Sequence, residues 1–192
     1  MKIETRFKKF SLWLLASFVA IVVMKMPAHA STNTVHLDIH VSINAAKSLS
    51  IGTTSYNFGA LAVNTSSVSA AAIVVTNDST ALQETYTVQG ANATGGNGWT
   101  LNTSTGSLDN YVLGVQFASA RPSDDDTTWS SSLASVSAVA CSDSQFGAGS
   151  GQSGYQVPAV GSITRNLWLR MITPLFVSDA VQKDTTVTLA VQ

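Results

Sequence analysis

Apolar and polar residues alternate most regularly between residues 35 and 43. Apolar side chains occupy every second position there, and polar side chains occupy the positions between them. A period of two predicts a β-strand with one buried and one hydrated face. The apolar side consists of Val35, Leu37, Ile39, Val41 and Ile43, and the polar side begins with His36, Asp38 and His40.

Eight further runs with strand-like composition follow, separated by loops rich in Gly, Ser, Thr and Asn. Two of these runs are predicted to point one face inward, with Leu113, Val115 and Phe117 on one and Leu167, Leu169 and Met171 on the other. Nine short strands at this spacing predict a single all-β domain, a β-sandwich of the jelly-roll or immunoglobulin-like type. The eight runs cover residues 48–51, 56–58, 68–76, 84–89, 99–102, 112–117, 165–172 and 185–191.

A long segment between residues 121 and 154 interrupts this pattern. It carries three consecutive aspartates, at positions 124–126, and only residues 133–139 show any periodicity. We expect an elaborated crossover with one short strand or helix in it. The glycine-rich residues 147–154 are predicted to form a loop.

The first thirty residues have the order of a secretory signal peptide. Basic residues lie between positions 2 and 9, an apolar run covers residues 12–24, and residues 27–30 end in a small-x-small pattern. The apolar run is shorter than the roughly 20 residues of a membrane-spanning helix, so we expect cleavage after Ala30 and no membrane span afterwards. The predicted organisation is a signal peptide at 1–30, an amphipathic strand and hinge at 31–47, and a sandwich at 48–192. A secreted, cell-surface or periplasmic location follows.

Charge and cysteine content narrow the possible partners. Residues 31–192 hold five basic and ten acidic residues, a formal charge of −5, and scattered cations on such a chain do not predict nucleic-acid binding. Cys141 is the only cysteine, which excludes an intrachain disulfide and a pair of zinc thiolates. We expect a small, partly buried side chain there, against the alternative of an intermolecular disulfide or a reactive thiol.

The motifs of the chain predict no enzyme, no cofactor and no metal. Residues 147–154 lack both the G-x-S-x-G nucleophile elbow and the Lys-Ser/Thr of a phosphate-binding loop. His36, Asp38 and His40 are expected to form a polar strand face, with a shared metal ion as the alternative. The aspartates at 124–126 are expected to form a solvated turn, with calcium binding as the alternative.

Aromatic residues allow a sugar-stacking platform as a competing type of surface. Core packing is expected for Trp99 and Tyr86, whereas both a buried and an exposed position stay open for Trp129. Trp168 alternates with apolar neighbours, so we expect it at a sheet interface, or exposed with Arg170 packed on it. The platform would draw on Trp99, Trp129, Trp168, Tyr56, Tyr86, Tyr111 and Tyr155.

Two stretches resemble camelysin/TasA-like or bacterial immunoglobulin-like secreted domains. The first includes the run from Tyr56 to Asn64 with its Phe-Gly-Ala-Leu, then Ile73 to Asn77 and Glu84 to Val88; the second runs from Val160 to Met171 and continues into the last strand. The resemblance implies an exported β-sandwich. In the fibre-forming members it also implies assembly by passing an N-terminal strand to the next subunit.

These observations lead to one functional expectation and one alternative. The apolar stripe of residues 35–43 would aggregate if it stayed exposed, so it is buried either in its own sandwich or in a neighbour's. We therefore expect an exported, non-enzymatic structural subunit of a cell-surface or extracellular fibre or matrix, which associates with itself through this strand. The alternative is a surface module that binds a cell-surface polymer or glycan.

Overall fold

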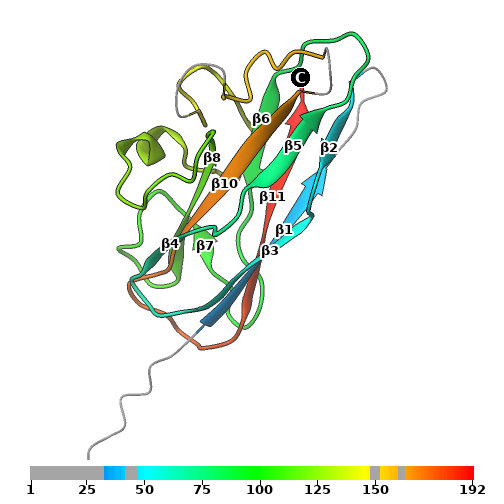
Figure 1. Ribbon diagram of the computed structural model, residues 1–192. Helices are drawn as coiled ribbons and strands as arrows, with labels where there is room; N and C mark the ends of the chain where they lie inside the picture. The colour runs from blue at the N-terminus through cyan, green and yellow to red at the C-terminus, as the bar shows by residue number, and fades with distance from the viewer. Residues whose placement is uncertain (1–32, 42–46, 148–151, 160–162) are drawn as a thin grey trace, which may run out of the picture. The chain divides into compact units, whose positions relative to one another are not determined.

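The structure is a computed structural model that describes residues 33–41, 47–147, 152–159 and 163–192 (Figure 1). These residues belong to one compact unit. Its elements are β1 (Asn33–Val41), β2 (Leu49–Ile51), β3 (Ser55–Leu61), β4 (Ser66–Val68), β5 (Ile73–Asn77), β6 (Tyr86–Gly90), β7 (Thr100–Leu101), β8 (Asn110–Phe117), the 3₁₀ helix η1 (Thr127–Ser131), β9 (Val139–Ala140), β10 (Thr164–Ile172) and β11 (Lys183–Val191).

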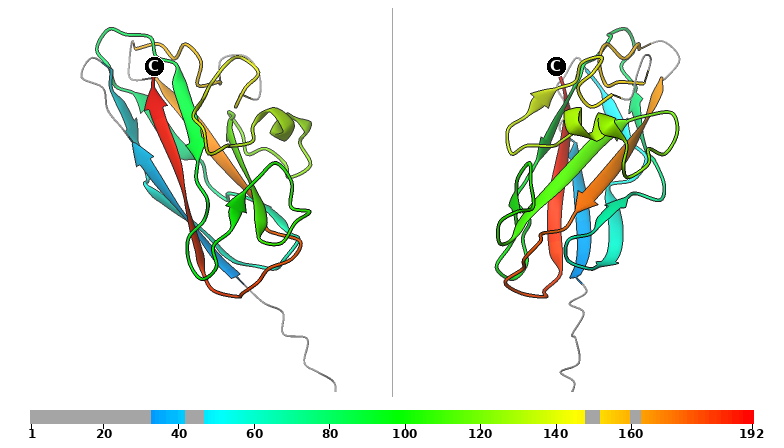
Figure 2. Two further views of the ribbon diagram at one scale, coloured as in Figure 1. Left: turned by 180° about the vertical axis from the view of Figure 1, so that it is seen from behind. Right: turned by 90° about the vertical axis from the view of Figure 1, so that its left-hand side faces the viewer.

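The strands form two sheets that pack as an all-β sandwich, which confirms the predicted fold class. One sheet has the order β3-β1-β11-β6-β9, and the other has the order β2-β5-β10-β8-β7 with β4 paired to β10. Figures 1 and 2 show β1 and β11 in one layer and β8 and β10 in the other.

Strand β1 occupies an interior position of its sheet. It pairs in parallel with β11, so that the first and last strands of the fold are neighbours, and it pairs antiparallel with β3 on its other side. A bulge between Val35 and His36 shifts the register with β3. Gly59, opposite Val35, has a φ of +73°, a conformation in which glycine avoids the steric cost of a Cβ atom.

The core lies between the two sheets and follows the predicted inward faces. Leu113, Val115 and Phe117 of β8 are fully buried, as are Leu167, Leu169 and Met171 of β10. The opposing sheet contributes the alternate residues of its central strands, which the period-two pattern also predicts. These residues include Val35, Leu37, Ile39, Tyr86, Val88, Val187 and Leu189.

The predicted strand at 68–76 is two strands, because the ladder with β10 breaks at Ser69. Strand β4 pairs with Arg170 to Ile172, and β5 pairs with Thr164 to Leu167. Between them the Ser69 N–H donates to the Leu169 carbonyl over 2.8 Å, and the Leu169 N–H donates to the Ser69 hydroxyl over 3.1 Å. A side-chain oxygen thus replaces a backbone acceptor, and the chain leaves the ladder.

Segment 121–154 contains both a short helix and a short strand, where one of the two was expected. The helix is η1, which precedes the periodic residues 133–139, and only Val139 of that stretch belongs to a strand, β9. The Asp126 side chain caps η1 by accepting from the Thr128 N–H over 2.9 Å. A local capping signal therefore decides where the helix begins.

Trp168 is neither at the interface between the sheets nor exposed, so both predicted positions were wrong. It is 8% exposed and packs with Val68, Ala118 and Trp129 in a second, smaller apolar cluster. Its indole N–H donates to the Ala118 carbonyl over 3.0 Å. Arg170 instead lies over the ring of Trp129, with its guanidinium carbon 5.7 Å from the ring centroid.

Candidate functional site

The structure places the first three residues of the predicted apolar stripe in the core. The exposed fractions of Val35, Leu37 and Ile39 are 1%, 0% and 4%. Val41 is the last residue of β1, and its side chain lies outside the described residues, as do Ile43 and the predicted hinge residues 44–46. The buried part of the stripe is therefore contributed by alternate residues of one continuous strand.

Both long edges of β1 are paired, and we call the space it fills between β3 and β11 the β1 slot. Without β1, the facing backbone groups of β3 and β11 would lack ladder partners. Burial of Val35, Leu37 and Ile39 contributes about 1.5 to 3 kcal/mol each, or about 5 to 9 kcal/mol together. Because a whole domain is stable by only about 5 to 15 kcal/mol, the sandwich requires a strand in this slot.

The other face of β1 is hydrated and polar. Asp38 and His40 are exposed and His36 is half-buried. In the part of the chain that the structure describes, no group of three or more His, Cys, Asp and Glu side chains comes together to hold a metal ion. The residues paired with these three positions are mostly hydroxyl or amide residues, namely Ser55, Asn57, Asp184, Thr186 and Thr188.

One end of the sandwich, which we call the Lys183 pole, is closed by an ion pair between a buried lysine and a half-buried aspartate. Lys183 lies opposite Val35 in the parallel ladder and is fully buried. Its ammonium nitrogen is 2.5 Å from Asp179 Oδ1, donates to the Gly95 carbonyl over 2.8 Å and lies 5.9 Å from the Trp99 ring centroid. The hydrogen bond from Lys183, supported by two backbone N–H groups, lowers the pKa of Asp179 to about 2, so the Asp179 carboxyl group is ionised at neutral pH.

The opposite end, the Glu84 pole, holds both chain segments that flank residues 42–46. The Ser48 N–H donates to Oε1 of the buried Glu84 over 2.8 Å. The Gln192 N–H donates to the neighbouring Thr85 carbonyl over 2.9 Å, so β11 ends here, and Val41 pairs with β11 near that end. Desolvation raises the pKa of Glu84. A buried carboxyl group thus anchors the point where the chain enters the second sheet.

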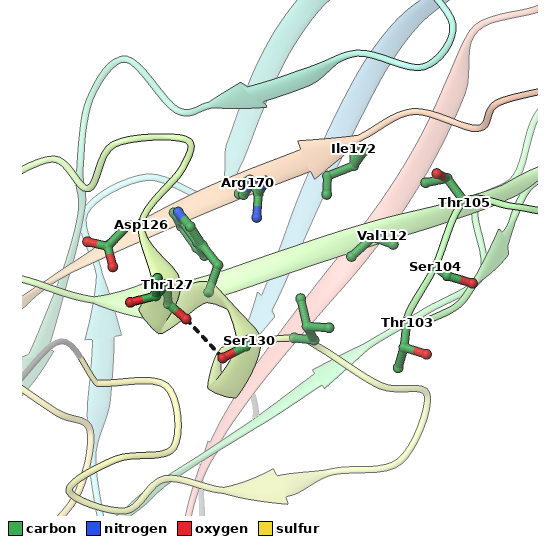
Figure 3. Close-up of a pocket in the computed structure, with 11 residues that line it drawn as sticks. Thr103, Ser104, Thr105, Val112, Asp126, Thr127, Ser130, Arg170 and Ile172 are labelled. Atoms are coloured by element: carbon green, nitrogen blue, oxygen red, sulfur yellow. Dashed lines mark hydrogen bonds between the residues drawn. The ribbon is translucent and has the colours of Figure 1, made fainter.

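A shallow hollow of about 430 Å³ lies on the outer side of β8 and β10 (Figure 3). Arg170 lies in it, and its Nε donates to Asp124 Oδ1 over 2.9 Å and to the Ser66 hydroxyl over 3.0 Å. Stacking on Trp129 holds the guanidinium group in place. The remaining lining is a mixture of hydroxyl and aliphatic side chains, including Thr103, Ser104, Thr105, Thr127, Ser130, Val112, Leu133 and Ile172.

The three consecutive aspartates have separate structural partners. Asp124 pairs with Arg170, and Asp126 caps η1. The pKa of Asp125 is lowered, chiefly by a hydrogen bond from the Ser123 side chain. The three carboxylates therefore serve an ion pair, a helix cap and a hydrated turn.

The predicted sugar-stacking platform is not formed by the tryptophans. Trp99, Trp129 and Trp168 are 2%, 1% and 8% exposed, and a sugar ring needs an exposed aromatic face on which to stack. Trp99 and Tyr86 lie in the core as predicted. Trp129 is covered because Gly114 leaves room for its ring, and a Cβ at that glycine would lie 2.7 Å from it.

Cys141 is a free, buried cysteine. Burial raises the pKa of its thiol to about 12, so the reactive thiolate is scarce at neutral pH. This environment favours the predicted packing role over the alternative of a reactive thiol.

No family model matches the chain, and no curated protein matches it. Among the described residues, no helix is long and apolar enough to cross a membrane.

The sequence did not predict three polar contacts, which lie at the Lys183 pole, in the hollow around Arg170 and at the Glu84 pole. Lys183 and Asp179 are four residues apart, a spacing that has no meaning in a strand pattern, and they meet because the chain turns just before β11. Arg170 and Asp124 come from distant segments. Glu84 had one detectable signal: it is the only glutamate after residue 30, and it precedes a strand.

Proposed function

We propose that this chain is an exported, non-enzymatic structural subunit of a cell-surface or extracellular fibre or matrix, and that it associates with itself by exchanging β1. One observation carries the proposal. An interior strand of the sandwich is also the first of the described strands, and the chain connects it to β2 through residues 42–46.

The topology supports exchange of β1 between subunits. Strand β1 can leave its slot while the other strands of the domain stay in place. The β1 strand of a second copy carries the same apolar side chains and would pair with the same residues of β3 and β11. An exchanged strand would therefore make the same contacts as the original one. The alternative of a permanently self-completed sandwich has the same contacts. Concentration and the connecting segment decide between the two states.

Export is supported by the sequence of residues 1–30, with its basic, apolar and small-residue segments in order. The lone cysteine does not argue against export, because the apolar core between the sheets stabilises the domain without a disulfide. The outer face of β1 is polar, with Asp38 and His40 exposed, which suits a subunit surrounded by water.

Two neighbouring substitutions test the role of β1. Ile39→Asp places an unpaired charge in the core, and His40→Ser changes the exposed residue beside it. Sedimentation and negative-stain imaging of the protein at high concentration should show assemblies for the unchanged protein and for His40→Ser, but none for Ile39→Asp. A monomer at every concentration for the unchanged protein would refute the proposal.

The hollow around Arg170 favours a second candidate function, a module that binds a surface glycan. Its hydroxyl side chains and guanidinium group match the hydrogen-bonding groups of a sugar. Binding to a glycan array that is lost in Arg170→Ala and retained in Arg121→Ala would support this function. Arg121 is the matched control, because it binds the backbone carbonyls of Val68 and Ser69 instead.

A further inference from the structure

We infer that exchange of β1 closes reciprocally between two copies of this chain, which meet at their Glu84 poles. The inference rests on the proposed function and goes further, because it states how many subunits one exchange step joins. It follows from the register of β1 and from the number of residues that connect it to β2.

An exchanged β1 enters its new slot in only one way that preserves the core. Its apolar residues face the core when β1 runs parallel to β11 in the observed register, in which Leu37 pairs with Thr185 and Ile39 with Val187. A slip by one residue would turn these side chains outward. The end of the donated strand, at Val41, therefore always lies at the Glu84 pole of the acceptor.

The connection is short compared with the sandwich. From Val41 to Lys47 the chain spans at most about 22 Å when fully extended. Strand β1 has nine residues, so its ends lie about 26 Å apart. The donor's own Glu84 pole, where Ser48 is anchored, cannot lie beyond the acceptor's Lys183 pole. The two Glu84 poles are thus brought together, and a head-to-tail stack is not reached.

This arrangement favours closure over growth. The displaced β1 of the acceptor stays tethered at its Val41 end to the Glu84 pole of its own subunit, beside the empty slot of the donor. The second transfer is intramolecular, with an effective concentration in the millimolar range for a short linker. A third subunit at micromolar concentration competes about a thousandfold less well for the empty slot of the donor. The product is a two-fold symmetric dimer, and a longer fibre needs a further contact outside the β1 slot.

A cysteine pair across the β1–β11 ladder tests this geometry. Asp38 and Thr186 are partners in the observed register, and adjacent strands lie about 4.8 Å apart, within the range that a disulfide bridges. The variant Asp38→Cys with Thr186→Cys, expressed from the complete sequence, is unfolded, refolded at high concentration and oxidised. Products are separated on a denaturing, non-reducing gel, and Asp38→Cys alone is the control. Buried Cys141 is present in both.

The three outcomes are distinguishable. Covalent dimers without larger species, in which titration finds no accessible thiol left, would support reciprocal exchange. A ladder of covalent oligomers would retain the proposed function and overturn reciprocal closure. Monomers with an internal disulfide only would overturn both, because each strand would then fill its own slot.

Discussion

Replacing Leu37 with alanine tests whether β1 fills its slot in solution. Leu37 is fully buried between Tyr56 of β3 and Thr185 of β11. Truncating a buried leucine lowers the free energy of unfolding by about 2 to 5 kcal/mol, since transfer and cavity terms add. For a domain of this size each kcal/mol shifts the midpoint temperature by about 2 to 4 °C. A loss of about 3 kcal/mol therefore lowers it by about 6 to 12 °C.

The neighbouring substitution Asp38→Ala is the matched control, because Asp38 is exposed on the opposite face of the same strand. It should change the free energy of unfolding by less than about 0.5 kcal/mol. Urea unfolding followed by tryptophan fluorescence measures both variants, since Trp99, Trp129 and Trp168 are buried. Equal, small effects of Leu37→Ala and Asp38→Ala would refute the buried position of β1. A midpoint that depends on protein concentration would indicate exchange.

Four further outcomes follow. Leu169→Ala should cost about 2 to 5 kcal/mol in urea unfolding, and Arg170→Ala should cost clearly less, because Leu169 is fully buried and Arg170 is not; equal costs would contradict the assigned faces. The pKa of Glu84 is raised, so the ionised carboxylate destabilises the fold when the pH is above the ordinary pKa of 4.5. Glu84→Gln should therefore be more stable than the unchanged protein at pH 7 but not at pH 4. The pKa of Asp179 is lowered to about 2, so the stabilising effect of its carboxylate should vanish as the pH falls from about 4 to about 2. Comparing the free energies of unfolding of Asp179→Asn and the unchanged protein across this range tests this. Cys141 should react with a thiol reagent only after unfolding, and fast reaction of the native protein would contradict its burial.

The period-two pattern predicted most strands of the sandwich, because alternation directly encodes one buried and one hydrated face. It failed at residues 68–76, where the run is continuous in sequence but Ser69 supplies a side-chain acceptor that ends one ladder. The pattern of apolar residues does not reveal where a side-chain hydroxyl replaces a backbone carbonyl as the hydrogen-bond acceptor. A short strand or helix was expected in segment 121–154, but the position of the helix at Thr127–Ser131 was not predicted, since its start depends on one capping carboxylate, Asp126.

The surroundings of Trp168 show a second limit of sequence reasoning. Alternation correctly placed it on the face opposite to Leu167 and Leu169. It did not reveal that the loop carrying Trp129 folds over that outer face and buries it. The Lys183 pole was unpredictable for the same reason, because the contact between Lys183 and Gly95 joins segments 88 residues apart. When a distant loop covers one face of a strand, the alternation of apolar and polar residues in that strand does not reveal it.

Complementation between two defective variants tests self-association through β1 most directly. Ile39→Asp has an intact slot and a defective strand, whereas Val187→Asp has an intact strand and a defective slot, because Val187 is the buried partner of Ile39 in β11. Each variant alone should fail to unfold cooperatively. Refolded together, they should regain a cooperative transition and form a complex that contains both chains, with the β1 strand of Val187→Asp in the slot of Ile39→Asp. A mixture that behaves as the sum of its two components would contradict strand exchange.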